Sequence, residues 1–529
     1  MGEPIRTLAI VGGGTAGWLA ASLINAARNR RNDGPDLRIV LIESPNVPII
    51  GVGEATTLSM VNALAMLGVD EADYFQKCDA SIKAAVKFIG WDRNPDGSPQ
   101  SFYHPFEAPD ALYAFSPAYH YLRRARQGRQ QPPIAHAMAV GPPLLDANRA
   151  PRAYDGTPFE GLAPYAYHLD AVLFANFLRD YATTLGVEYV SDDVLGATLD
   201  ARGFIETLTL KERGAFPVDF VIDCSGFQGL IIRKTLNEPF IPYDRWLLCD
   251  KALAVQLPHA AGAPLTPYTT STALGAGWSW QVPLYSRRGT GYVFSSRFAT
   301  DDQAIDEFLG YLGEAGKGAS PRVIKMNIGR SRRSWVNNCL AIGLAGGFIE
   351  PLESTSIHFI QMAIRWFIDS FPDKDGNPAL IDNYNHLVQE LYEEIRDFIT
   401  LHYRLSNRTD TPFWQAAREG LELPDGVKAK LERWRTKLPS PTDVTNRLSL
   451  FSEWAYIYVL AAKGFWDGAA LPIQDAVSDA DYEAFARSMQ QRQADALARA
   501  PDHRDLITRL RAQPATPWYR PEPAAAAVP

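Results

Sequence analysis

The segment Leu8-Ala-Ile-Val-Gly-Gly-Gly-Thr-Ala-Gly-Trp-Leu-Ala-Ala21 decides which fold the rest of the sequence is compared with. Its apolar start predicts a strand, Gly12-x-Gly14-x-x-Gly17 predicts a tight turn, and the alanine-rich end predicts a helix. Glycine lets the backbone approach a pyrophosphate, which then lies on the helix N-terminus. Alone the pattern is weak evidence, because a strand-to-helix turn without a ligand can also carry it.

A second apolar run, residues 37–42, ends in Glu43. An acidic residue at this point of a dinucleotide-binding unit accepts hydrogen bonds from a ribose. Strand, glycine turn, helix and terminal acid together predict a bound dinucleotide. They leave open whether it is NAD or FAD.

Composition describes an ordinary globular protein: of 529 residues, 46% are hydrophobic and 21% are charged. This length predicts about two to four domains or one large elaborated fold. A net charge of −8 gives no reason to expect nucleic acid or an anionic membrane as a partner. The sequence lacks a recognisable secretion signal and an apolar run of membrane-spanning length. We therefore expect a cytoplasmic protein.

Cysteine and histidine usage argues against a metal centre. The cysteines are scattered without a CxxC spacing, which predicts buried thiols in a reducing compartment: Cys78, Cys224, Cys249 and Cys339. The nine histidines form no HExxH or HxH pattern. We expect no metal ion.

The middle of the chain favours FAD over NAD. Residues 194–199 and 205–210 alternate as a hairpin, and residues 219–226 form a buried strand that ends at a glycine. This order is typical of the back half of a two-part FAD-binding domain, in which a residue placed like Val194 presents its backbone to the adenine. Residues 339–347 then repeat the pattern of a late strand followed by glycines.

The stretch from 81 to 91 alternates like one strand, which puts Lys83 and Lys87 on a shared polar face. Such a face is ordinarily solvated. The preceding loop, 48–56, has small residues that suit close passage over a flat ligand, and a plain loop explains them equally well.

Taken together, these motifs resemble the tryptophan halogenase family of flavin-dependent halogenases over about residues 5–415. The paired tryptophans are the most specific part, and Val282 stands where the family usually carries Ile. The matching motifs are Gly12-x-Gly14-x-x-Gly17, Gly51-Val-Gly-Glu-Ala-Thr56, Ser81-Ile-Lys83, Trp278-x-Trp280-x-Val-Pro283 and Glu350-Pro-Leu-Glu-Ser-Thr355.

The resemblance implies an α/β architecture: a Rossmann-like, two-part FAD-binding fold of the flavin monooxygenase type, elaborated by further elements. Residues 1–415 would form the FAD-binding and halogenation module, with an irregular substrate-side insertion at 92–165 and an inserted antiparallel sheet at 240–330. Residues 416–512 would form a helical C-terminal module, and the Pro/Ala-rich tail 513–529 would be disordered. The residues implied to contact FAD are Gly12, Gly14, Thr15, Ala16, Gly17, Glu43, Glu54, Ala55, Val194 and Leu344.

The chemistry implied by the resemblance is a relay. Reduced FAD reacts with oxygen to give a C4a-hydroperoxide, and chloride or bromide attacks its distal oxygen to give hypohalous acid. That acid passes through a tunnel to Lys83, which receives it by a hydrogen bond or as a haloamine. Glu353 would hold the halogenating species and accept the proton from the ring.

Two further groups follow from the same resemblance. Thr355 and Ser356 would bind the halide through backbone N–H groups at a helix start, although ordinary helix capping explains them too. The family usually has Gly in place of Ser356, which leaves the halide preference open. Trp278, Trp280 and Pro283 would line the tunnel and keep the organic substrate from the flavin. The alternative interpretation is that the two tryptophans only fill the hydrophobic core.

His104 and Phe106 match positions that flank an indole ring, and Trp454 is aligned loosely with another aromatic wall. Members that act on tryptophan carry a Tyr-rich, acidic segment that clamps the amino acid. Residues 439–454 are shorter here and lack a Tyr pair. We therefore expect an indole, or another electron-rich aromatic, rather than free tryptophan.

Only one dinucleotide-binding pattern is evident, so we expect a separate NAD(P)H-dependent flavin reductase to supply FADH2. The sequence leaves open whether the chain forms a homodimer. Three other functions would also use a flavin site: an aromatic hydroxylase of the flavin monooxygenase type, a saturating flavin reductase acting on lipids, and a flavin-bound protein without catalysis. The hydroxylase is the main alternative, but it has no use for a tryptophan block or for Lys83.

Overall fold

The computed structural model describes residues 2–29, 37–48, 51, 53–112, 115–444 and 449–514. The tail expected to be disordered, 513–529, lies outside the described residues apart from 513 and 514. Val52 of the second glycine motif and residues 445–448 of the expected substrate segment also lie outside them.

The glycine turn follows a central strand of a six-stranded sheet. β1 (Thr7–Val11) pairs in parallel with β2 (Arg38–Glu43) and with β12 (Phe220–Asp223). The outer strands are β8 (Glu188–Ser191), β21 (Cys339–Ala341) and the antiparallel β20 (Trp335–Val336). Parallel strands covered on both faces are continuous apolar runs, which is why the sequence reveals them.

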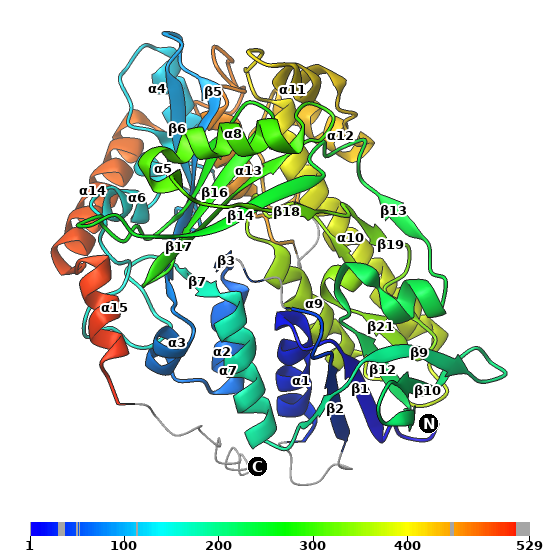
Figure 1. Cartoon of the computed structure of the whole chain (residues 1–529). Coiled ribbons are helices and arrows are strands. Elements are labelled where there is room, and N and C mark those ends of the chain that lie inside the picture. The colour runs from blue at the N-terminus through cyan, green and yellow to red at the C-terminus, as the bar shows by residue number, and fades with distance from the viewer. Residues whose placement is uncertain are drawn as a thin grey trace, which may run out of the picture.

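Helices cover one face of this sheet and a three-stranded meander covers the other (Figure 1). α1 (Thr15–Arg28) packs against α7 (Ala171–Thr184) and α9 (Ser356–Asp369). The meander consists of β9 (Val194–Leu199), β10 (Ile205–Leu210) and β11 (Gly214–Pro217), and its first two strands have the predicted bounds.

A second sheet lies above the first (Figure 1) and has seven strands in the order β18-β14-β17-β16-β15-β5-β6. The antiparallel strands expected at 240–330 are present, but β5 joins them in parallel with β15. α8 (Asp301–Leu312) packs against it. The strand bounds are β5 Ala85–Arg93, β6 Pro99–Pro105, β14 Lys251–Pro258, β15 Thr269–Ala273, β16 Gly277–Pro283, β17 Arg287–Phe294 and β18 Arg322–Lys325.

The insertion at 92–165 is more regular than predicted. It contributes β6 to the second sheet, and it contains the helices α4 (Ala118–Arg126), α5 (Ile134–Met138) and α6 (Gly141–Asp146). Prolines and glycines punctuate these short elements, and that composition suggested irregularity.

A third, small sheet has the order β3-β7-β4 and contacts both the second sheet and the helices of the first layer. β3 (Gly53–Ala55) touches β16 and β17, while β7 (Ala166–Asp170) contacts α2 and α7. β4 (Ser81–Lys83) is an edge strand. The prediction of one strand over 81–91 is wrong, because the chain leaves this sheet at Ala84 and enters the second sheet with β5. Residues 166–170 form β7, and α7 begins directly after it at Ala171.

The C-terminal helices pack against early parts of the chain. α13 (Glu453–Ala462) contacts β6, α14 (Asp479–Arg499) contacts α6, and α15 (His503–Arg511) contacts α3 (Glu71–Lys77), as Figure 1 shows for the last two. The remaining elements are α2 Ser59–Leu67, η1 Gly226–Gln228, η2 Leu230–Thr235, β13 Phe240–Pro242, η3 Gly313–Gly316, β19 Gly329–Ser331, η4 Gly343–Ala345, β22 Gly347–Phe348, α10 Pro378–Arg404, α11 Pro412–Gln415, η5 Ala416–Gly420 and α12 Asp425–Trp434.

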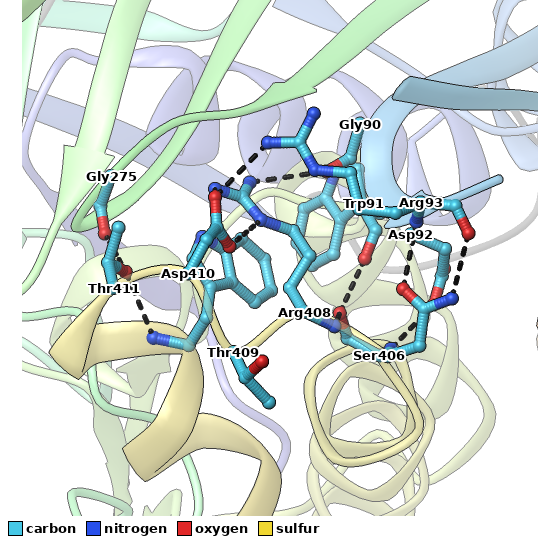
Figure 2. Close-up of polar contacts among 12 residues, drawn as sticks. Gly90, Trp91, Asp92, Arg93, Gly275, Ser406, Arg408, Thr409, Asp410 and Thr411 are labelled. Atoms are coloured by element: carbon cyan, nitrogen blue, oxygen red, sulfur yellow. Dashed lines mark hydrogen bonds and ion pairs between the residues drawn. The ribbon is translucent and has the colours of Figure 1, made fainter. Parts of the chain in front are cut away.

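A polar network fixes the end of β5 to the loop after α10 (Figure 2). Ser406 donates to the carbonyl of Trp91, and Arg408 donates to the carbonyl of Gly90 at 3.2 Å. The Arg408 guanidinium also pairs with Asp410 at 2.8 Å. Asp92 forms a buried ion pair with Lys463 at 2.8 Å, which adds the end of α13 to the same junction. Residues far apart in sequence are thereby held around the strand that follows Lys83.

Gly17 and Gly14 of the turn differ in how closely other atoms approach them, and a matched pair of variants tests this difference. A Cβ on Gly17 would lie 1.9 Å from the carbonyl oxygen of Gly12, whereas a Cβ on Gly14 would meet nothing within 4 Å. We expect Gly17→Ala to lower the free energy of unfolding by about 1–3 kcal/mol, and Gly14→Ala to leave it nearly unchanged. Chemical denaturation measures both. Equal stabilities of the two variants would contradict this assignment.

Candidate active site

A cavity of about 580 Å³ opens at the glycine turn and extends to the second sheet. All but one of the residues predicted to contact FAD line it: Gly12, Gly14, Thr15, Ala16, Glu43, Glu54, Ala55, Val194 and Leu344. Gly17 is the exception. It lies against the carbonyl of Gly12, where the absence of a side chain lets α1 pack on the turn.

The α1 end of this cavity suits a pyrophosphate. Gly14 is the N-cap residue of α1, its position has no capping side chain, and the first turn carries no acidic residue. The first N–H groups of the helix are thus available to an anion. A Cβ on Gly13 would lie 2.1 Å from the carboxyl carbon of Glu43, so glycine here makes room for that acid. The residues present therefore fit a dinucleotide.

Lys83 is fully buried on β4, so the expectation of a solvated face is wrong for it. Its ammonium donates to the carbonyl oxygen of Thr56 at 2.9 Å and lies 5.1 Å from the ring centroid of Phe106. Burial lowers the pKa of Lys83 to about 7, against the opposing pull of the Glu353 charge. Lys87 belongs to the other sheet, where it donates to Tyr103.

Glu353 is buried as well, but its charge is stabilised. Both carboxylate oxygens lie 3.0 Å from Nδ1 of His104, and Nε2 of His402 lies 2.9 Å from one of them. Burial favours the neutral acid, yet the attraction of His104 and the hydrogen bonds from both histidines prevail and lower the pKa of Glu353 to about 2. The carboxylate is therefore ionised at neutral pH.

The sequence reasoning missed His402, which lies near the end of α10 in an apolar run. Its only signal was a histidine among residues that otherwise suit a core. His104, predicted to flank an indole ring, is a hydrogen-bond partner of Glu353. Its role beside an indole stays a prediction.

The segment after Glu353 has the features of an anion site. α9 begins at Ser356, its N-cap residue is Thr355, and no side chain caps it, so side-chain capping does not explain this motif. Among the described residues, the buried Thr355 hydroxyl has no hydrogen-bond partner. Ser354 has φ +62°, a strained conformation for a residue with a side chain. Ser354 and Ser356 line the cavity.

Trp278 and Trp280 point to the same side of β16, with ring centroids 6.3 Å apart. Trp280 lines the cavity, while Trp278 is buried beside Trp91. Pro283 is not among the cavity-lining residues, and its carbonyl oxygen accepts a hydrogen bond from Ser81.

The structure places Trp454 on α13, with its ring 5.5 Å from that of Tyr458. The ring that approaches His104 from this part of the chain is Phe451, at 6.4 Å. Phe451 also stacks on Phe398 at 3.8 Å. Sequence reasoning missed Phe451, because no local pattern distinguishes it from a core residue.

Comparison with known proteins identifies the family. Residues 7–479 match the family described as tryptophan halogenase. The chain belongs to this family. It is 39% identical over 463 residues to tryptophan 7-halogenase RebH of Lentzea aerocolonigenes, covering 85% of this chain and 86% of RebH. The crystal structure of a tryptophan halogenase from Shewanella frigidimarina superposes with TM-score 0.90 at 34% identity, covering 96% of this chain and 98% of that one.

The flavin-dependent halogenase BrvH of Brevundimonas superposes with TM-score 0.84 at 33% identity, over 96% of this chain and 99% of BrvH. The expected fold class and the expected halogenase class are confirmed. The aromatic hydroxylase alternative receives no support. As a flavin-dependent halogenase, the enzyme uses FAD and a halide co-substrate.

Within the part of the chain that the structure describes, no helix has the length and apolarity needed to cross a membrane. Among the same residues, no group of three or more His, Cys, Asp and Glu side chains is arranged to hold a metal ion.

The buried Lys83 makes the halogenase less stable than it would otherwise be. Its pKa is about 7 in the folded chain and about 10.5 when unfolded, so the penalty is full below about pH 7 and falls as pH rises toward 10.5. We expect Lys83→Met to raise the free energy of unfolding by roughly 2–4 kcal/mol at pH 6.5 and by much less at pH 10. Denaturation at both pH values tests this. A gain that does not shrink with pH would contradict it.

Proposed function

We propose that this halogenase modifies an electron-rich aromatic ring at Lys83 and Glu353, outside the flavin cavity. The observation that carries the proposal is a pair of buried groups beside the cavity: an amine bonded to the Thr56 carbonyl and a carboxylate contacted by two histidines. The pKa values of both groups are lowered, to about 7 and about 2, so the amine can lose its proton near neutral pH while the carboxylate stays charged. Neither residue lines the cavity, but both are one step from its wall. Lys83 donates to Thr56, which follows the wall residue Ala55, and Glu353 precedes the wall residue Ser354.

The cofactor end of the site follows from the cavity walls. The N-terminus of α1 would hold the pyrophosphate of FAD, Glu43 a ribose, and the backbone at Val194 the adenine. Bound reduced FAD supplies the oxygen activation that oxidises a halide ion to hypohalous acid. The N–H groups of Thr355 and Ser356 would hold the halide at the cavity edge. Trp280 on the wall would keep the aromatic substrate out.

Lys83 would receive the halogenating species. With a pKa of about 7, it is present at neutral pH both as an ammonium and as a free amine. The ammonium donates a hydrogen bond that makes the halogen more electrophilic, and the amine can form a haloamine. The bond to the Thr56 carbonyl and the nearby Phe106 ring fix the position of Nζ in either case.

Glu353 would accept the proton that the ring loses after halogenation. A carboxylate with a pKa of about 2 is a weak base, but a halogenated ring cation is a strong acid, so ionisation matters more than basicity here. His104 and His402 keep the carboxylate charged and oriented. They are positioning residues in this proposal.

We further propose an indole, or a larger indole-bearing or electron-rich aromatic, as the substrate in preference to free tryptophan. The acid available in the segment before α13, Asp443, is already paired with Lys437 at 2.5 Å and with Arg433 at 3.5 Å. It is therefore not available to hold the ammonium group of an amino acid. The aromatic rings of Phe106 and Phe451 near Lys83 and His104 suit a flat apolar ligand.

A separate NAD(P)H-dependent flavin reductase would supply FADH2, because the sequence has a single glycine-rich dinucleotide motif. Dependence on reduced nicotinamide favours the cytoplasm for both enzymes.

Substitutions of Lys83 test the catalytic pair. We expect Lys83→Ala to lower halogenation by at least about 100-fold, while FAD binding and FADH2 oxidation continue, because the flavin cavity is intact. Lys83→Arg keeps a hydrogen-bond donor but removes the nucleophilic amine, so its residual rate separates the two modes of halogen transfer. Bromination is measured with a reductase, FAD, NADH, bromide and an indole panel by mass spectrometry. Undiminished bromination by Lys83→Ala would overturn the proposal.

The same assay tests the substrate class. We expect kcat/KM for indole to exceed that for free tryptophan by about tenfold or more, because each unmade contact to a charged group costs about 1.5–3 kcal/mol. N-acetyltryptamine, which lacks both charges, serves as a control and should behave like indole. Comparable turnover of tryptophan and indole at equal low concentration would refute the preference.

A further inference from the structure

The strand that carries Lys83 is short and lies at an edge. β4 pairs with β7 along one side only, through Ser81–His168, Ile82–Tyr167 and Lys83–Ala166. An edge strand presents backbone groups that have no partner strand. In a buried setting such groups need other partners. The position of Lys83 therefore depends on what replaces the missing strand.

A histidine from the other end of the chain takes that place. The N–H of Ile82 donates to Nε2 of His503 at 3.1 Å, and Nδ1 of His503 donates to the carbonyl oxygen of Leu265 at 2.9 Å. Together these bonds require the neutral tautomer with its proton on Nδ1. His503 is fully buried at the start of α15, and burial lowers its pKa to about 4, which agrees with a neutral ring.

The backbone around His503 is itself anchored. Its N–H donates to the carbonyl of Asn148 at 3.1 Å, and the N–H of Ala150 donates to the carbonyl of Pro501 at 2.9 Å. The next N–H of the edge, that of Ala84, donates to the carbonyl of Pro267 at 2.9 Å. Thus His503 and the segment 265–267 together act as a substitute strand for β4.

The paired side of β4 is tied to the flavin cavity. Ser81 donates to the carbonyl of Pro283, so its oxygen accepts from Nδ1 of His168 at 3.0 Å. Nε2 of His168 then accepts from the hydroxyl of Thr269 at 2.9 Å, and Thr269 lines the cavity. These hydrogen bonds hold the side of β4 that pairs with β7, and His503 holds the opposite edge.

We propose that His503 is a positioning residue for Lys83: its neutral imidazole holds Ile82 of β4 and thereby keeps the Lys83 amine on Thr56 and out of water. The inference rests on the proposed catalytic role of Lys83. The reason for its effect is geometric, because a displacement of about 1 Å at a reacting group lowers rates by orders of magnitude. The charged and titratable groups that act on Lys83 in this setting are Glu353 and His168.

Three substitutions of His503 separate its two bonds. His503→Gln places an amide near the position of Nε2, so it retains an acceptor for Ile82 and loses the bond to Leu265. His503→Asn places its amide near Nδ1 and does the reverse, while His503→Ala loses both. Thr508→Val is the matched control, because it removes a 3.1 Å contact of the same helix with Tyr285 and touches no atom of β4.

Two readouts distinguish positioning from folding alone. The first is kcat for bromination, with trapping of hypohalous acid that escapes from the enzyme. The second is the pH midpoint for carbamylation of Lys83 by cyanate in flavin-free protein, followed by peptide mass spectrometry. We expect the Ala and Asn variants to lose about tenfold or more in kcat and to release more hypohalous acid. Their labelling midpoint should rise toward the ordinary lysine value, because water reaches the amine.

The Gln variant and the Thr508→Val control should stay within about threefold of the parent in kcat and keep its labelling midpoint. If His503→Ala fails to fold, the kcat values of the His503→Gln and His503→Asn variants decide. A kcat of the Asn variant that equals or exceeds that of the Gln variant overturns the proposal. A parent-like labelling midpoint in the Ala and Asn variants also overturns it. If Lys83→Ala still halogenates, the proposed function fails first. If Lys83→Ala is inactive while all His503 variants act like the parent, this inference alone fails.

Discussion

The desolvation of one amine is the constraint on which the rest of the active site depends. Lys83 is completely buried, and its hydrogen-bond acceptor is the neutral carbonyl of Thr56. The attraction of the Glu353 charge offsets only part of the free energy that the ammonium loses on leaving water. Removing an ammonium from water costs several kcal/mol after relaxation. The protein must recover that cost elsewhere, and the result at the site is a lysine that titrates near neutrality.

Glu353 is also buried, but its charged form is stabilised, whereas the charged form of Lys83 is destabilised. Its two histidine neighbours donate to the carboxylate, and their contribution exceeds the cost of burial, whereas Lys83 has no comparable set of acceptors. The pKa values of both groups are lowered, which destabilises the charge of Lys83 and stabilises the charge of Glu353. The difference lies in the hydrogen-bond partners and not in depth, because both side chains are shielded from solvent.

The sequence predicts the parts of this arrangement that are encoded locally. The glycine turn, Glu43 and the hairpin of β9 and β10 depend on spacing and alternation within a few residues, and each forms where expected. The burial of Lys83 is different. Alternation across 81–91 cannot reveal that the chain changes sheets at Ala84, because the partners of this edge are distant in sequence: Pro267 lies 183 residues from Ala84, and His503 lies 421 residues from Ile82.

The same reason explains why His402 and Phe451 could not be predicted. His402 and Phe451 reach the site through the packing of α10 and of the segment before α13, and neither lies in a recognisable motif. Trp454, chosen from a loose alignment, is a neighbour of Tyr458. Gly17 matched its motif but serves helix packing instead of lining the cavity. Local patterns therefore indicate the residues of the cavity wall, whereas residues that are brought together by distant packing leave no local signal.

The separation of the two halves has a consequence for how specificity can change. Thr269, His168 and Ser81 connect the cavity wall to β4 through a continuous set of hydrogen bonds, and β3 of the same small sheet contacts β16 and β17. Rigid elements thus fix Lys83 and Glu353 relative to the flavin cavity. Phe451, whose ring centroid lies 6.4 Å from that of His104, belongs to the loop before α13. Loops on a rigid scaffold tolerate substitution best. Under the proposed function, a change there would alter which ring reaches Lys83 without altering how the oxidant is made.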